Sequence, residues 1–163
     1  MTRIINTNKL NKKIAYLQKL KSLNKESGLI FNSLDNILND FIGHKLFTIL
    51  KFDKINSNLE RVYTSKPREY PLQGKKDVIR NFWQVQVLEK GIVYIGYNSQ
   101  DIKNSFSDFD LIKKLGCSSV LIIPVKSGNN IKGSVNLLHE ESWYSDNDIK
   151  GAQKLVQLIS EVL

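Results

Sequence analysis

The middle of the chain holds side chains whose types and spacing suit the binding of a small ligand. Arg61 and Tyr63 lie two residues apart in a short apolar segment. Alternate residues of a strand point to the same face, so we predict that these two side chains share one face. There the Arg61 guanidinium offers a planar fork for a carboxylate or a phosphate. The alternative is an ion pair between Arg61 and a nearby acid such as Glu60 or Glu69.

Two aromatic residues follow this pair along the chain. Tyr70 precedes Pro71 in a segment rich in turn residues, so its ring and hydroxyl could cover a cavity from a loop. The alternative is a tyrosine that fills the core. Trp83 belongs to the helix expected after that loop, where it is either an aromatic wall of the cavity or a core residue.

Three polar residues interrupt apolar surroundings further on. Ser118 and Ser119 stand at a helix-to-strand junction, where hydroxyls and free amides can hold an anion or simply form a turn. Asn136 interrupts an apolar strand, so its carboxamide needs hydrogen-bond partners, supplied either by a structural network or by a ligand.

The sequence offers little for catalysis or for metal binding. Cys117 is the single cysteine, and no His or Asp is spaced near it to favour a thiolate. The two histidines, His44 and His139, lie far apart in sequence, and Glu140 next to His139 points to the opposite face of a strand. We therefore predict no catalytic residue, no metal site and no nameable cofactor. A lone cysteine in a chain of this size also fits a cytoplasmic protein.

Hydrophobic periodicity predicts the elements that must position these residues. The strongest strand signal is Ser118–Lys126, which is apolar on both faces and should be covered on both. Within it, Pro124 cannot donate to a ladder, so we expect a bulge or a missing neighbour there. Helices are predicted at 10–20, 30–41, 77–89, 107–115 and 145–162, and strands at 45–52, 59–64, 92–97, 118–126 and 131–140, with a loop at 65–76. Gly43 should end the second of these helices, and Asp77 should cap the third. Capping boxes, formed by Ser107 with Asp110 and by Ser145 with Asp148, should begin the last two.

The charge is concentrated at the N-terminus. The net charge is +8, yet residues 1–25 hold seven basic side chains and no acid. The remainder is close to neutral, and lysine far outnumbers arginine, which is the residue that reads phosphates and base edges best. Nucleic acid is therefore not an expected partner. The 163 residues contain no run of about 18 apolar residues, so no membrane span is expected.

We divide the chain into a basic amphipathic extension, residues 1–23, and one domain, residues 24–163. In the extension, Leu10, Ile14, Leu17 and Leu20 form one apolar stripe. The stripe could pack on its own domain, form a dimer seam or lie on a membrane surface.

The order of elements and several motifs resemble the GAF domain family, in particular short bacterial proteins that consist of little but one GAF domain. The resemblance covers about residues 24–163 and is most specific from Ser118 to Leu163. The family marks there are Pro124, Gly133, Asn136, the pair Trp143-Tyr144 and the Ser145–Asp148 box; upstream they are Arg61 to Pro71, Gly74 and Trp83.

The resemblance implies an α+β, profilin-like fold. In this fold an antiparallel sheet has the terminal helices on one face and a ligand cavity with loops and short helices on the other. It also implies a sensory protein that binds a small molecule, often dimerises through its terminal helices and regulates a partner.

The residues that characterise specialised branches of the family have no match in this chain. Reductase members use a cysteine pair or triad, whereas this chain has Cys117 alone, and pigment-binding relatives place other residues beside their cysteine. The fragment KFDK at 51–54 lacks the spacing of the cyclic-nucleotide constellation.

We therefore expect a non-enzymatic, small-molecule-binding sensory module that acts through a downstream signalling protein. Its ligand would lie between the sheet face bearing Asn136 and the 65–83 segment, with Arg61 taking an anionic group. Two alternatives stay open, a thiol-dependent reductase built on Cys117 and a dimerising adaptor without a ligand.

Overall fold

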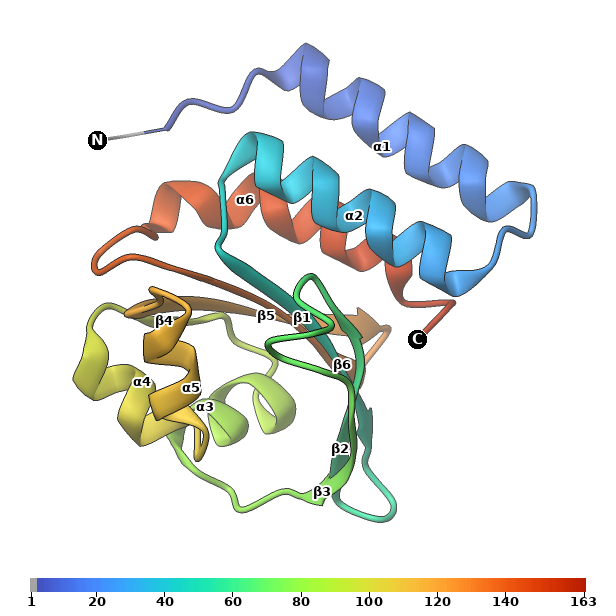
Figure 1. The fold of residues 1–163 in the computed structure, drawn as a ribbon. Helices are drawn as coiled ribbons and strands as arrows, with labels where there is room; N and C mark the ends of the chain where they lie inside the picture. Colours follow the sequence, from blue (N-terminus) through green and yellow to red (C-terminus); the bar gives the residue numbers. More distant parts are fainter. Residues whose placement is uncertain (1–2) are drawn as a thin grey trace.

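The computed structural model describes residues 3–163, which fold around one six-stranded sheet (Figure 1). The strand order is β3-β2-β1-β6-β5-β4, and every neighbouring pair is antiparallel. The strands are β1 (Leu46–Asp53), β2 (Asn58–Thr64), β3 (Gln73–Asp77), β4 (Tyr94–Gly96), β5 (Ser119–Ser127) and β6 (Asn130–His139). Both predicted hairpins, β1–β2 and β5–β6, are confirmed.

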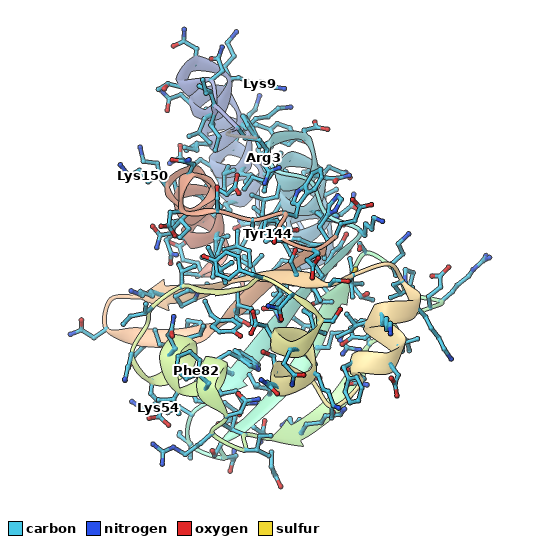
Figure 2. All side chains as sticks on the ribbon, turned by 90° about the vertical axis from the view of Figure 1, so that its left-hand side faces the viewer. Arg3, Lys9, Lys54, Phe82, Tyr144 and Lys150 are labelled. Carbon is cyan, nitrogen blue, oxygen red and sulfur yellow. The ribbon has the colours of Figure 1, made fainter. Side chains whose placement is uncertain are left out.

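Helices cover both faces of this sheet, which confirms the α+β architecture (Figure 1). One face carries α2 (Ser27–Phe41) and α6 (Asp146–Val156), with α1 (Thr7–Ser22) outside them and the short turn η2 (Gln157–Ile159) after α6. The other face carries four short elements, which are α3 (Phe82–Gln84), the π-helical turn η1 (Val85–Glu89), α4 (Ser99–Ser105) and α5 (Phe109–Lys114). Figure 2 shows Tyr144 on the first side of the sheet and Phe82 on the second.

Strand β5 supplies both apolar layers, because its side chains alternate between the faces. Leu121 and Ile123 join the core beneath α2 and α6, whereas Val120 and Ile122 join the core on the α3–α5 side. All residues from Ser119 to Val125 are buried, so the predicted coverage of both faces is confirmed.

At Pro124 the sequence predicts a bulge or a missing neighbouring strand. The neighbouring strand β4 pairs only with Val120–Ile122 and does not reach Pro124. The missing N–H of Pro124 therefore leaves no hydrogen bond unmade on that side of the strand. A register shift in the β5–β6 ladder follows at Val125/Lys126. A missing neighbour at Pro124 and an adjacent bulge are therefore both present.

The apolar stripe of α1 is buried within its own chain. Leu17 is fully buried and Leu10 nearly so, in the cluster that also contains residues of α2 and α6. Arg3 ties the segment before α1 to α6, because its guanidinium donates to both carboxylate oxygens of Asp148, at 3.0 and 2.9 Å. Of the three readings of this stripe, packing on its own domain is the one found, and exposed lysines such as Lys9 occupy the outer surface (Figure 2).

The predicted C-terminal end of α2 and the predicted capping box at the start of α6 are both found. Gly43 adopts φ +93° after the last turn of α2, and its N–H donates to the carbonyl of Leu38, as expected for a glycine that ends a helix. At α6 the carboxylate of Asp148 accepts the N–H of Ser145 at 2.9 Å, which confirms the predicted capping box.

Four local predictions are wrong. Residues Gln73–Asp77 form the edge strand β3 instead of a loop; their polar, exposed side chains have no apolar alternation, and backbone pairing with β2 alone defines the strand. The helix predicted from Asp77 begins at Phe82, after an Asn81–Gln84 capping box. Helix α4 was not predicted. Ser107 does not cap α5, whose N-cap position is Asp108.

The burial of the α1 stripe leads to a stability prediction. Leu17→Ala should lower the free energy of unfolding by about 2–5 kcal/mol, because it leaves a cavity in a closed apolar cluster. Leu23→Ala is the matched control, since Leu23 is 56% exposed and should change stability by no more than about 0.5 kcal/mol. Denaturant unfolding measures both, and equal effects would contradict the packing of α1 on its own domain.

Candidate ligand-binding site

A cavity of about 260 Å³ lies on the α3–α5 side of the sheet. Its floor consists of alternate residues of three strands, which are Thr48, Leu50, Leu59, Arg61, Asn136 and Leu138. Its walls come from residues 70–84 and 105–112. The hollow predicted between the sheet face bearing Asn136 and the 65–83 segment is therefore present, and four predicted site residues line it: Arg61, Tyr70, Trp83 and Asn136.

Arg61 is the least satisfied polar side chain of the site. It is only 7% exposed, and its Nη1 donates to the carbonyl of Pro71 at 2.6 Å. Its Nη2 lies 3.6 Å from Oδ2 of Asp108, beyond hydrogen-bond length. Its Nε alone, among buried side-chain nitrogen and oxygen atoms of residues 3–163, has no partner. The ion-pair alternative is therefore found, with Asp108 as the acid rather than Glu60 or Glu69.

Tyr70 covers the guanidinium of Arg61. The Arg61 Cζ atom lies 3.7 Å from the centre of the Tyr70 ring, which is a cation–π contact. Burial, and then the negative charge of Asp108, raise the pKa of the Tyr70 hydroxyl, so it is protonated at neutral pH. Both alternatives hold here, because the side chain is 4% exposed and also lines the cavity.

Trp83 forms a fixed aromatic wall. Its indole Nε1 donates to the carbonyl of Ser105 at 2.9 Å, and its ring lies 6.0 Å from that of Phe106. Because Trp83 is 3% exposed, it is both a core residue and a cavity residue.

Asn136 and Thr48 place polar groups on the cavity floor. They are direct neighbours across β1 and β6, and both are nearly fully buried. The Asn136 carboxamide oxygen accepts from the Ser134 hydroxyl at 2.8 Å, but its amide nitrogen has no acceptor within residues 3–163. Sequence reasoning missed Thr48, although it interrupts the apolar face of Leu46 and Leu50 as Asn136 interrupts its own strand. Asp108, in a connecting loop, gave no such signal.

The prediction that Arg61 and Tyr63 share a face is wrong. In the β1–β2 ladder Leu50 pairs with Arg61 and the next residue, Ile49, pairs with Tyr63, so Val62 is an extra residue. Such a bulge reverses the alternation of side chains. Arg61 therefore faces the cavity, whereas Tyr63 faces the helical layer.

On that side Tyr63 joins a buried polar cluster with α2. Its hydroxyl donates to Asp35 at 2.7 Å, and the other oxygen of Asp35 lies 2.6 Å from Nε2 of His44. The ring of Tyr63 also lies edge-on to Phe31 and Phe47. Burial and the hydrogen bond to Asp35 raise the pKa of Tyr63.

The displacement of Tyr63 from the cavity can be tested directly. Tyr63→Phe should lower the free energy of unfolding by about 1–3 kcal/mol, because it leaves a buried carboxylate with one donor fewer. The affinity for any ligand found for the cavity should stay within about twofold, because the residue lies outside the site. Calorimetric titration and denaturant unfolding provide the two readings. A large loss of affinity at unchanged stability would place Tyr63 in the site.

The two serines also lie outside the cavity. The N–H of Ser118 donates to the carbonyl of His139 at 2.8 Å, and the hydroxyl of Ser119 donates to the carbonyl of Glu140 at 2.5 Å. Ser119 is fully buried. These hydrogen bonds match the alternative of turn chemistry and leave no hydroxyl directed at the cavity.

Cys117 borders a different hollow, of about 250 Å³, between α4 and α5. The thiol is 1% exposed, and burial raises its pKa from 9.0 to about 11. At neutral pH only about one molecule in ten thousand then carries the thiolate, which is the nucleophilic form. No group of three or more His, Cys, Asp and Glu side chains suited to a metal occurs within residues 3–163.

The raised pKa of Cys117 predicts slow alkylation. Near neutral pH, iodoacetamide should modify the native protein at least about a hundredfold more slowly than the unfolded chain, as mass spectrometry will show. Because the folded state holds this proton more tightly, stability should also fall as the pH rises from 9 to about 11. Cys117→Ala should make that slope shallower, and the remainder comes from buried tyrosines such as Tyr70, whose pKa is also raised. Rapid alkylation of native protein would favour the thiol-dependent alternative.

No family model matches the chain, and no curated protein matches it in sequence. Solved structures do match. The GAF domain of a two-component sensor histidine kinase from Bacillus halodurans superposes with a TM-score of 0.65 at 14% identity, over 80% of this chain and 88% of that one. The phycocyanobilin-bound GAF domain of a cyanobacterial phytochrome gives 0.72 at 13% identity, over 98% and 94%.

The chain has a GAF domain fold. A third match of this chain, fRMsr of Staphylococcus aureus in complex with its substrate, has a TM-score of 0.69 at 12% identity and covers 99% of this chain and 97% of that one. At these identities the likeness establishes the fold. No helix within residues 3–163 is long and apolar enough to cross a membrane.

Proposed function

We propose that this GAF domain is a sensory module that binds a small organic ligand in the cavity under the sheet and regulates a partner protein. The similar structures include a domain of a sensor histidine kinase and a domain with a bound pigment, so the fold serves both sensing and ligand binding elsewhere. The proposal for this chain rests on its own cavity.

The unbonded Nε of the buried Arg61 guanidinium is the observation that carries this proposal. An arginine stays charged, and a buried charge without hydrogen bonds costs several kcal/mol of stability. Here one N–H is bonded, Nε has no partner, and the nearest carboxylate lies beyond hydrogen-bond length. An anionic group of a ligand in the cavity would supply the missing acceptor. Arg61 is the proposed anion contact, and Tyr70, Trp83 and Asn136 are the proposed walls and floor.

The output would pass through β2 to the helical layer. Arg61 on the cavity face and Tyr63 on the helical face belong to the same short strand, and Tyr63 is bonded to Asp35 of α2. A change at Arg61 that moves β2 would therefore reach α2. The expected homodimer through the terminal helices remains a prediction, to be checked by light scattering. In that dimer the α1 stripe could not be the seam without leaving its own core.

Two other functions compete with this one. The fold also occurs in fRMsr, solved with a substrate, which keeps an enzyme built on Cys117 as an alternative. Against it stands the buried thiol with its raised pKa. A dimerising adaptor without a ligand is the other, and against it stands the cavity with the unbonded Nε of Arg61.

Closing the cavity should abolish ligand binding without unfolding the domain. Gly74 lines the cavity, and a Cβ added there meets no atom within 4 Å, so we expect the fold to tolerate the bulky side chain of Gly74→Trp at the edge of the cavity. Gly28→Trp on α2 is the matched control, since a Cβ there also meets nothing. Compounds that raise the melting temperature of the native protein, found by screening metabolites, should fail with Gly74→Trp and succeed with Gly28→Trp.

Mass spectrometry of molecules released from protein purified without denaturation complements this screen. No released compound together with no stabilising metabolite would contradict the sensory proposal and favour the adaptor. Binding that survives in Gly74→Trp would place the ligand elsewhere.

A further inference from the structure

We propose that the cavity selects a compact organic acid with one negative charge at one end and a neutral hydrogen-bond acceptor at the other. This inference rests on the proposed function and names the ligand class. It follows from two polar regions of the cavity, Arg61 beside Asp108 at one end and the pair Thr48 and Asn136 on the floor, with apolar side chains such as Leu59 and Leu138 between them. The remaining wall is mixed and includes Gln73, Lys76 and Asp77.

The Arg61 end accepts a single charge. Its guanidinium has donors to spare, but the carboxylate of Asp108 lies 3.6 Å from Nη2 and also lines the cavity. A ligand carboxylate bound to the free Nε edge of Arg61 would therefore approach an existing negative charge. A dianion such as phosphate would meet stronger repulsion there in a site of low dielectric, so the geometry favours a carboxylate.

The floor offers neutral donors. The Asn136 amide nitrogen and the Thr48 hydroxyl make no side-chain hydrogen bond within residues 3–163, while the Asn136 oxygen is already engaged by Ser134. Arg61 Nε is the one fully buried polar side-chain atom without a partner within residues 3–163, so these two donors are open to the cavity, where a ligand can reach them. Unpaired donors of this kind discriminate strongly for a ligand that carries an acceptor. A carbonyl or hydroxyl oxygen fits this need.

The spacing of the two ends limits the length of the ligand. Arg61 pairs with Leu50, and Thr48 lies two residues further along β1. Strand geometry then places the two backbone positions roughly 8 Å apart. Between them stand apolar walls that include Leu59, Leu138 and the ring of Trp83, fixed by its hydrogen bond to Ser105. A single ring or a short carbon chain spans that gap.

Four small molecules of similar size test the ligand class. para-Hydroxybenzoate has one carboxylate and a distal oxygen; para-hydroxybenzamide lacks the charge, benzoate lacks the distal oxygen, and terephthalate carries a second charge. Binding is followed by the fluorescence of the buried Trp83 and by calorimetric titration. We expect para-hydroxybenzoate to bind most tightly, benzoate about three- to tenfold more weakly, and the other two about tenfold or more weakly.

Two variants assign the two ends. Arg61→Gln should abolish the preference for para-hydroxybenzoate over its amide and leave the preference over benzoate. Asn136→Ala, combined with Thr48→Val, should do the reverse. Circular dichroism verifies that each variant is folded, and Gly28→Trp serves as a control that should preserve all four affinities.

The possible results separate this inference from the proposed function. An amide or a dianion that binds as well as para-hydroxybenzoate would overturn the single-charge assignment, and so would the absence of millimolar binding by all four probes. Equal affinities for benzoate and para-hydroxybenzoate would overturn the role of Asn136 and Thr48. In each case a metabolite that stabilises the protein and is blocked by Gly74→Trp would still support a sensory cavity of different chemistry.

Discussion

The single extra residue in β2 is the constraint on which the rest of the site depends. In a regular ladder Arg61 and Tyr63 would lie on one face. The bulge at Val62 instead sends the arginine into the cavity and the tyrosine into the helical layer. One strand thus supplies both the charge of the cavity and the hydrogen bond that holds α2.

The charge of Arg61 is retained at a cost to stability. An apolar residue at this position would make the core more stable, because only complete hydrogen bonding offsets the desolvation free energy of a buried ion. Three contacts offset part of this desolvation free energy: the hydrogen bond to the Pro71 carbonyl, the cation–π contact with the Tyr70 ring and the negative charge of Asp108. Locally unfavourable residues that the surrounding structure keeps in place are typical of functional sites. Within residues 3–163, Nε of Arg61 remains the one buried side-chain nitrogen or oxygen atom without a hydrogen-bond partner.

Much of the fold could be predicted from the sequence, because its strongest signals are local. The two apolar faces of β5, the ending of α2 at Gly43 and the capping box of α6 all follow from residue type and spacing. Strand β3 could not be predicted, since a polar edge strand is defined by its neighbour rather than by its own side chains. The bulge at Val62 likewise depends on pairing with β1, so the parity argument placed Tyr63 on the wrong face. Asp108 reaches the site only through tertiary packing.

The helical layer determines which side chains this side of the protein exposes. The apolar stripe of α1 is already used inside the chain, and the segment before it is tied to α6 by Arg3. What α1 presents outward is its lysine face, so recognition there would depend on charge rather than on apolar area. Helix α2 lies between that layer and β2, and Asp35 bonds it to the strand that carries Arg61. The cavity is therefore connected to α2 by a short covalent and hydrogen-bonded path, whereas α1 contacts that path only through packing.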